Sequence, residues 1–369
     1  MKKRLCTLCL ILLAVGTTFA GCKKKTSDEP ASEKKVTQTV ATEEPQLADN
    51  HEGQAQSILT GEWIDESLAS KRPIALMIEN TEATLPQYNI SKADLIYECP
   101  VEGGITRLMG LYQDYSGMDR IGNVRSCRLY YVYFAKEFDA IYVHAGESKY
   151  AVDVLDSDFI DNIDGIKAVG NTCFYRTNDR KAPHNLYISS DGISQAITEL
   201  GYRTDLNADY KGHYQFAKDE NPVTLTDSSD AAVVALAYVN PKPWFEYHED
   251  DGLYYRYEFG NPQKDAVTDE QLAVRNIILQ ECNSHIMDTG NGTLDVDYMS
   301  GGIGKYISNG KAVDITWKKD SDTSPTRYYD ASGNEITLNQ GKTWVCIIPS
   351  DTAENNIVYG SKDEFEANK

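Results

Sequence analysis

The chain has 369 residues, of which 36 are Lys or Arg and 56 are Asp or Glu, so its formal net charge at pH 7 is −20. Proteins that bind a phosphate backbone need clustered cations, so this charge argues against a nucleic acid as a partner. The length is sufficient for two domains.

Residues 1–21 have the order of a secretory signal peptide. Basic residues Lys2 to Arg4 precede an apolar run from Leu8 to Val15, which is shorter than the roughly 20 residues of a membrane-spanning helix. The tetrapeptide Phe19-Ala-Gly-Cys22 resembles a bacterial lipobox, although Phe19 replaces the usual leucine. We therefore expect cleavage before Cys22 and a lipid anchor on Cys22 at the extracytoplasmic face of the bacterial membrane; simple secretion is the alternative. The mature charge would be −20 − 3 = −23.

Residues 22–62 are predicted to form a disordered tether. They contain no aromatic residue, and Ser, Thr, Glu, Gln, Lys and Ala predominate. Such a composition cannot bury a core. The basic run Lys23 to Lys25 lies beside the expected lipid, where it suits anionic headgroups better than nucleic acid.

Residues 63–222 are predicted to form a mixed α/β domain. Apolar runs of strand length occupy 73–79, 93–99, 105–112 and 140–144, and the second and third runs are joined through a Gly-Gly turn that favours a hairpin. Helical patterns occupy 126–137, 148–155 and 192–200, and the last ends at Gly201.

Residues 223–369 are predicted to form a mainly β, mostly antiparallel domain, which makes the whole chain α+β. Strand-like runs occupy 233–239, 244–248, 253–258, 273–282, 294–299, 305–308, 312–318, 326–329 and 343–348. The acidic turn Glu249–Gly252 is typical of a hairpin.

Five cysteines follow Cys22, at positions 99, 127, 173, 282 and 346. They have no metal-like spacing, and their odd number prevents complete pairing. We expect them to be small buried hydrophobic residues.

The candidate ligand-binding residues lie at predicted strand ends and glycine turns. They are Glu102, Arg107, Arg125, Arg128, His144, His184 and Asn185. Loops held by a rigid scaffold often carry binding residues, and arginines suit a carboxylate or a phosphate. Arg125 and Arg128 are expected to share one face at the start of a helix. The alternative is that these arginines only pair with carboxylates such as Glu102.

An enzyme is the second hypothesis. His144 precedes Ser148, and His184 follows Pro183 in a loop, so either imidazole could serve an envelope hydrolase or transferase. No serine lies in a Gly-x-Ser-x-Gly or Ser-x-x-Lys context, and Ser148 also suits a helix cap. No catalytic residue is assigned, whether the chain is an enzyme stays open, and no cofactor is expected.

Two further patterns receive weaker interpretations. The acidic residues from Asp153 to Asp164 do not have the EF-hand spacing, so no metal site is predicted and a solvated helix end explains them. Trp317, Lys318 and Arg327 could flank a groove in the β domain, although core packing explains the tryptophans equally well.

Several segments in the expected order resemble the YerB-like family of bacterial lipoproteins. They are Glu102–Arg107, Gly122–Arg128, His144–Gly146, Pro183–Tyr187, Gly310–Lys319 and Gly341–Trp344. Cys127, where alanine is usual, and Glu147 depart from the pattern but leave the charged positions intact. The family consists of two consecutive domains of unknown function, so the resemblance implies this architecture and no reaction. We expect the chain to bind an anionic cell-wall fragment or an envelope protein.

Overall fold

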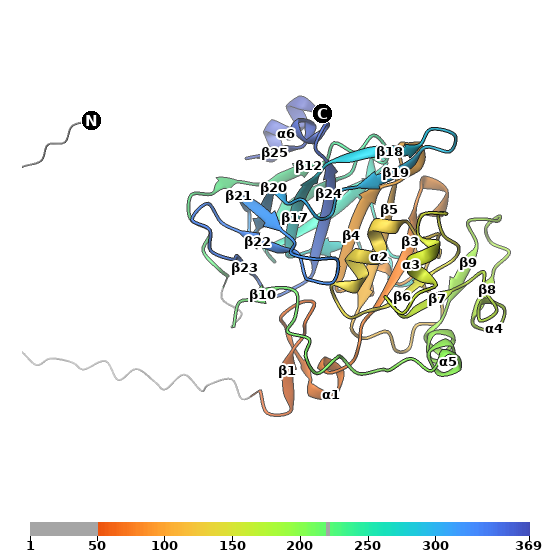
Figure 1. Cartoon of the computed structure of the whole chain (residues 1–369). Helices are drawn as coiled ribbons and strands as arrows, with labels where there is room; N and C mark the ends of the chain where they lie inside the picture. The colour runs from red at the N-terminus through yellow and green to blue at the C-terminus, as the bar shows by residue number, and fades with distance from the viewer. Residues whose placement is uncertain (1–50, 219–221) are drawn as a thin grey trace, which may run out of the picture. The chain divides into compact units, whose positions relative to one another are not determined.

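The computed structural model describes residues 51–218 and 222–369, which belong to one compact unit, His51–Lys369 (Figure 1). The expected signal peptide, Cys22 and residues 22–50 of the expected tether lie outside the described residues. Within the described ranges, no helix is both long enough and apolar enough to cross a membrane.

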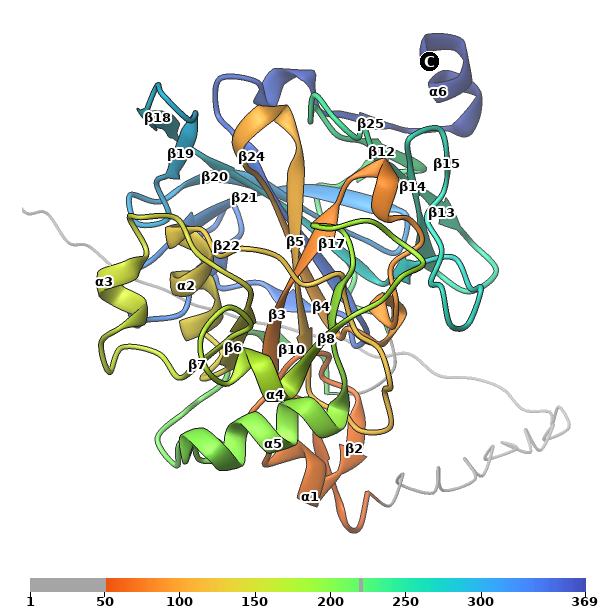
Figure 2. The same cartoon turned by 90° about the vertical axis from the view of Figure 1, so that its right-hand side faces the viewer.

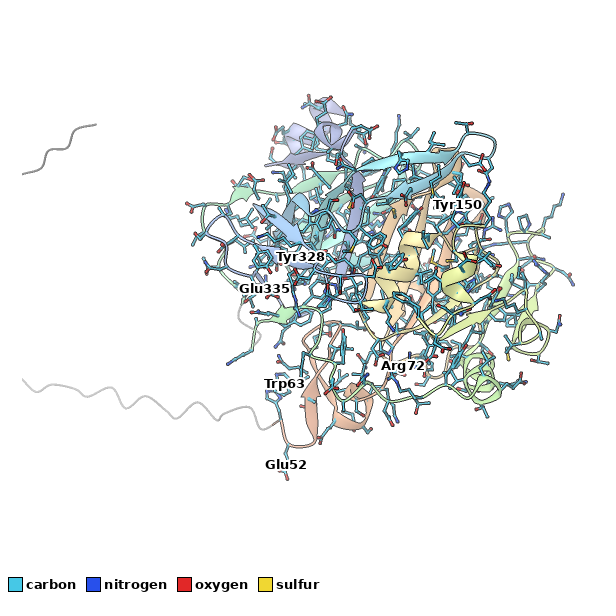
Figure 3. The ribbon with its side chains drawn as sticks, in the orientation of Figure 1. Glu52, Trp63, Arg72, Tyr150, Tyr328 and Glu335 are labelled. Carbon is cyan, nitrogen blue, oxygen red and sulfur yellow. The ribbon has the colours of Figure 1, made fainter. Side chains whose placement is uncertain are left out.

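Residues 51–62 are folded, which corrects the expected end of the tether. Strand β1 (Gln54–Gln56) pairs with β2 (Trp63–Asp65), and the side chain of Leu59 is fully buried. The labelled ring of Trp63 stacks on His51 with a centroid distance of 3.8 Å (Figure 3). The buried side chain of Leu59 and the pairing of β1 with β2 help to attach this largely polar segment to the rest of the fold.

A mixed sheet of eleven strands runs through the described residues. Its order is β11 (Ser229–Asp230), β21 (Lys311–Lys318), β20 (Gly302–Ser308), β17 (Asn276–Cys282), β24 (Thr343–Pro349), β4 (Leu95–Pro100), β5 (Thr106–Tyr112), β3 (Ile74–Asn80), β6 (Ile141–His144) and β7 (Asn162–Asp164), with β22 (Arg327–Tyr329) on β21. The pairs β17–β24, β24–β4, β3–β6 and β6–β7 are parallel.

Both faces of this sheet are buried. Along β3, Ile74, Leu76 and Ile78 belong to one apolar core, and Ala75 and Met77 belong to the other. This follows from the two-residue period of a strand, and it explains why the sequence of β3 is almost continuously apolar. Helix α2 covers one face, and a second sheet lies across the other (Figure 2).

The second sheet and four short ladders complete the strands. The second sheet has the order β15 (Asn261–Pro262), β14 (Leu253–Glu258), β13 (Trp244–His248), β12 (Val233–Ala235) and β25 (Ile357–Tyr359), with β16 (Ala273–Val274) on β14. Besides β1–β2, the ladders are β8 (Phe174–Arg176) with β9 (Leu186–Ile188), β10 (Gln215–Phe216) with β23 (Thr337–Leu338), and β18 (Ser284–Asp288) with β19 (Thr293–Val296).

The helices are short. They are α1 (Glu66–Ala69), α2 (Leu129–Lys136), α3 (Val152–Leu155), α4 (Gly170–Cys173), α5 (Ser190–Leu200) and α6 (Lys362–Asn368), with 3-10 turns η1 (Glu82–Thr84), η2 (Ile90–Lys92), η3 (Glu102–Gly104) and η4 (Ala353–Asn355). Helix α5 ends at Gly201, whose φ of 70° suits a glycine cap, as predicted. The described cysteines are free and buried, which is also as predicted.

The α+β class is confirmed, but the main sheet continues across the expected boundary at residue 222. Strand β24 lies parallel to β4, so residues from both halves of the chain share one ladder. The proposed division at residues 222 and 223 remains a prediction.

A fully buried ion pair reinforces this junction. Glu98 on β4 lies 2.8 Å from the guanidinium of Arg256 on β14, and the indole N–H of Trp344 on β24 donates to the same carboxylate at 3.1 Å. The guanidinium of Arg256 also lies over the Trp344 ring, 4.2 Å from its centroid. Strands β4, β14 and β24, which are distant in sequence, therefore meet at the carboxylate of Glu98.

We expect Arg256→Met to lower the free energy of unfolding by about 3–5 kcal/mol, because it leaves Glu98 as a buried charge without a counterion. Adding Glu98→Gln should recover part of that loss, because Glu258, the other buried carboxylate beside Arg256 at 3.7 Å, still lacks its counterion. The control is Lys305→Gln, which removes the exposed ion pair with Asp314 and should cost about 1 kcal/mol or less. Denaturant unfolding measures all three variants, and equal costs for Arg256→Met and the control would contradict this account.

Candidate functional site

The predicted site residues gather at one edge of the main sheet. Strands β3, β4, β6 and β7 point the same way, so their carboxyl ends lie at a common edge. Glu102 follows β4, and His144 ends β6. Arg107 lies at the start of β5, which runs in the opposite direction and begins at this edge. The carboxyl edge of parallel strands is where α/β sheets commonly hold ligands.

Residues 122–128 lie extended across this edge rather than starting a helix. The backbone N–H of Arg125 donates to the carbonyl of Met77 at 3.0 Å, and that of Cys127 donates to Gly146 at 2.8 Å. Helix α2 therefore begins only at Leu129. The expectation that Arg125 and Arg128 share a helix face is wrong, because backbone bonds to β3 and to the loop after β6 compete with helix formation.

The three predicted arginines converge on this extended segment. Arg107 is buried and donates from Nη1 to the carbonyl of Ser126 at 2.8 Å. Arg128 makes a two-point ion pair with Glu102, with Nε–Oε1 2.7 Å and Nη2–Oε2 2.6 Å. Burial lowers the pKa of Arg107, and the neighbouring charges of Arg128 and Arg125 lower it further. Arg107 therefore bonds directly to the backbone of the segment that carries the other two arginines.

Arg125 and His184 share the buried carboxylate of Glu79, the penultimate residue of β3. His184 Nδ1 lies 2.9 Å from Oε1, whereas Arg125 Nε lies 3.5 Å from Oε2. Arg125 adds one long hydrogen bond of 3.4 Å to the carbonyl of Pro183. Asn185 is buried, with its amide N–H donating to Thr177 and its oxygen accepting from Arg176. It therefore supports the loop.

His144 lies in the interior beside the carboxylates of Glu147 and Asp164. Its Nδ1 lies 3.0 Å from the carbonyl of Gly146, and its Nε2 lies 3.2 Å from Oδ1 of Asn162. Burial lowers the pKa of His144. Burial also raises the pKa of Glu147, and the negative charge of Asp164 adds to that rise.

A serine–histidine pair is not formed in the described parts of the chain. Ser126 donates its hydroxyl to the carbonyl of Ala145, and the buried hydroxyl of Ser148 has no hydrogen-bond partner there. The hydrolase hypothesis therefore gains no nucleophile from this geometry.

Ser148 follows β6, whereas the other secondary candidates, which were expected to flank a groove, lie elsewhere, on β21 and β22. Trp317 is only 1% exposed and donates its indole N–H to Glu281. Lys318 lies over the ring of Tyr329, and Arg327 pairs with Glu335, which is labelled with Tyr328 in Figure 3. Arg327 also lines a separate pocket of about 430 Å³ beside Glu137. The burial of Trp317 favours the core-packing interpretation of this residue.

Sequence reasoning missed a group of cations beside Arg125. Arg120, Arg125, Arg176, Arg180 and Lys181, which we call the basic surface, are all at least partly exposed. The sequence contains a sign of this group, because three cations lie within Arg176–Lys181, at the end of β8 and in the loop that follows it. Arg180 donates to the side-chain oxygen of Asn123 at 2.9 Å and to the carbonyl of Pro86 at 2.7 Å, which fixes this loop beside residues 122–125.

Both halves of the chain contribute strands to the main sheet, and cations lie along one edge of it. These features describe an α+β protein of two regions with a candidate binding site at that edge. Residues 59–203 match the family described as "Protein of unknown function (DUF3048) N-terminal domain", and residues 234–345 match the corresponding C-terminal domain. The chain therefore belongs to the DUF3048 family of YerB-like proteins.

A protein of Bacillus subtilis (strain 168) named "Putative lipoprotein YerB" is 30% identical over 302 residues, covering 79% of this chain and 85% of that protein. The crystal structure of YerB from Bacillus subtilis matches with a TM-score of 0.70, covering 81% of this chain and 98% of the solved chain. The recognition of the family, its two regions and its α+β fold are confirmed. These names assign no ligand and no reaction.

The Glu102–Arg128 pair predicts a pH dependence. Burial alone would raise the pKa of Glu102, but the hydrogen bonds and positive charge of Arg128 outweigh it, so the net pKa lies below its ordinary value. The pair therefore stabilises the fold above the unfolded-state pKa of about 4.3, and the contribution is lost as the pH falls through the lower folded-state pKa.

We expect Glu102→Gln to lower the free energy of unfolding at pH 7 by about 1 kcal/mol, because the pair is partly exposed and screened. The difference between the two proteins should shrink on acidification below about pH 4. Unfolding curves from pH 3 to pH 7 measure this. A difference that grows as the pH falls would contradict the assignment.

Proposed function

We propose that this protein is lipid-anchored outside the cytoplasm and binds an anionic cell-envelope ligand, a carboxylate or a phosphate, at the basic surface. One observation carries the proposal. In a chain of net charge −20, the described residues provide no ion-pair partner for Arg176, Arg180 or Lys181. Unpaired cations held together in a strongly acidic protein favour an anion from outside the chain.

Arg125 supports the same conclusion from its hydrogen bonding. Its side chain is 22% exposed, and its Nε, which is buried, faces Oε2 of Glu79 at 3.5 Å without a hydrogen bond. Only Oε1 of Glu79 is engaged with His184. A guanidinium has N–H donors in a planar fork that matches a carboxylate or a phosphate, and the described residues give Nη2 of Arg125 no hydrogen-bond partner, so this end of the fork remains for a ligand.

Aromatic rings lie beneath part of the basic surface. The guanidinium of Arg120 lies 4.2 Å from the ring centroid of Tyr88 and 4.7 Å from that of Tyr187, and it pairs with Asp179 at 3.0 Å. These contacts fix Arg120 and the loop from 176 to 181 before any ligand binds. Such preorganisation favours affinity, because less side-chain freedom is lost on binding.

The anchoring part of the proposal rests on the sequence around Cys22 and on the relative named as a lipoprotein. An anchor at Cys22 would keep the basic surface near the cell envelope. Envelope polymers are rich in phosphates and carboxylates, so the location and the chemistry of the site agree.

We expect Arg125→Gln and Arg180→Gln each to weaken binding of a carboxylate-bearing cell-wall disaccharide peptide about tenfold, because each removes a charge-assisted hydrogen bond worth about 1.5 kcal/mol. Inorganic phosphate serves as the second probe. Isothermal titration of the full chain in detergent at two salt concentrations measures both affinities.

Arg203→Gln is the matched control for these two variants. Arg203 is an exposed arginine paired with Asp139, which precedes β6 and so lies at the opposite end of the strands. It changes the net charge by the same amount and should leave both affinities unchanged. Equal weakening by all three variants would mean that only net charge matters, and the site assignment would fail.

Replacing Cys22 tests the anchor separately. We expect Cys22→Ala to abolish incorporation of radiolabelled palmitate and to move the chain from the membrane fraction to the soluble fraction. Cys9→Ala, a cysteine within the predicted signal peptide, should retain both label and location. Persistent labelling of the Cys22→Ala protein would contradict a lipid anchor at this position.

A further inference from the structure

The carboxyl ends of β6 and β7 bring together one histidine and two carboxylates. His144, Glu147 and Asp164 each offer one ligand atom, and these atoms lie within 4.8 Å of one another. His144 ends β6 and Asp164 ends β7, while Glu147 follows in the loop after β6. Glycine at position 146, with a φ of 80°, turns the chain so that Glu147 returns toward the strand ends.

The hydrogen bonds of His144 leave one nitrogen facing oxygen atoms. The amide N–H of Asn162 donates to the carbonyl of Leu155 at 2.8 Å, so the oxygen of that amide faces Nε2 of His144. Each ring nitrogen therefore faces an oxygen that can only accept, and a neutral ring satisfies only one of them. With the proton on Nε2, the lone pair of Nδ1 is directed toward the carbonyl of Gly146 at 3.0 Å and toward Asp164 Oδ1 at 3.8 Å.

Each of the two carboxylates also has one buried oxygen without a hydrogen-bond partner among the described residues. Asp164 is 1% exposed, and its Oδ1 accepts from the backbone N–H groups of Gly146 and Ile166 at 2.9 and 3.0 Å. Its Oδ2 is buried and has no partner among the described residues, and the same holds for Oε2 of Glu147. A buried carboxylate oxygen without a partner is costly, so this arrangement needs an occupant.

A second proton on His144 would not complete the site. It would lie between Nδ1 and the carbonyl of Gly146 and would leave the oxygens of Asp164 and Glu147 without partners. A divalent cation would accept the Nδ1 lone pair and both carboxylate oxygens at once, provided that the carbonyl of Gly146, 3.0 Å from Nδ1, turns aside or becomes a further oxygen ligand. With the cation on Nδ1, the N–H at Nε2 would still donate to Asn162. A hydrogen bond of this kind from the second ring nitrogen usually orients a metal-binding histidine.

We propose that His144, Glu147 and Asp164 bind a divalent first-row transition-metal ion, with Nδ1 as the nitrogen ligand. Such ions hold nitrogen and oxygen ligands at about 2.0–2.2 Å, so neighbouring ligands lie about 3.0–3.6 Å apart. The three ligand atoms, which lie within 4.8 Å of one another, would have to draw closer to reach this spacing, and Glu147, the least buried of the three residues, is placed to move. The imidazole favours zinc or a similar ion over calcium, which prefers oxygen ligands alone.

Sequence reasoning missed this group because its members belong to different local patterns. His144 was weighed as a catalytic residue, whereas Asp164 was assigned to an acidic helix end. Only the parallel pairing of β6 with β7, in which His144 lies opposite Asp164, brings them together.

Titration of the full chain with zinc in detergent, followed by calorimetry and thermal unfolding, tests the proposal. We expect one zinc ion per chain and a higher unfolding temperature. Glu147→Gln and Asp164→Asn should each weaken binding at least tenfold. Asparagine at 164 keeps an oxygen for Gly146 and Ile166, so this variant preserves the local backbone bonds.

His285→Asn is the matched control. His285 is an exposed histidine 4.0 Å from Asp295, and its replacement should leave zinc affinity unchanged. X-ray absorption of the zinc-loaded natural chain gives a test that needs no variant, with nitrogen and oxygen neighbours expected. A sulfur-dominated shell, equal affinity for zinc and calcium, or unchanged affinity in both carboxylate variants would overturn the proposal. Failure to bind zinc would also overturn the proposal, and a proton shared by Glu147 and Asp164 would then explain the cluster.

Discussion

The parallel pairing of β24 with β4 is the contact on which the rest of the structure depends. It joins residues some 250 positions apart in one ladder, from Thr343 beside Leu95 to Cys346 beside Glu98. The buried Glu98–Arg256 pair adds the second sheet to the same junction. Each charge is buried and therefore depends on the other for its partner, so the two halves must pack together correctly for this pair to form.

The direction of the strands explains where the chemical groups lie. Because β3, β6 and β7 run parallel, Glu79, His144 and Asp164 end at one edge although they are distant in sequence. Residues 122–128 cross this edge and carry the arginines. The result is two neighbouring arrangements: exposed cations around Arg125, and an interior histidine between two carboxylates.

The local elements were largely predictable, but their assembly was not. The apolar runs at β3, β5 and β24 and the glycine cap of α5 have strong local signals, because burial and backbone conformation determine them. The extended course of residues 122–128 depends on bonds to Met77 and Gly146, which no local pattern contains. Glu79 was missed for a related reason, since a carboxylate within an apolar strand gives no sign of its partners. The metal-like cluster required knowledge of the register between β6 and β7.

The central claim is that the basic surface binds an anion from outside the chain and does not only form ion pairs with the protein's own carboxylates. A crystal structure of the full chain grown with inorganic phosphate tests this most directly. The account predicts an anion held jointly by Arg125 and Arg180, with Glu79 still bonded to His184. The account would be contradicted if Arg125 made two short hydrogen bonds to Glu79 and phosphate bound elsewhere or not at all.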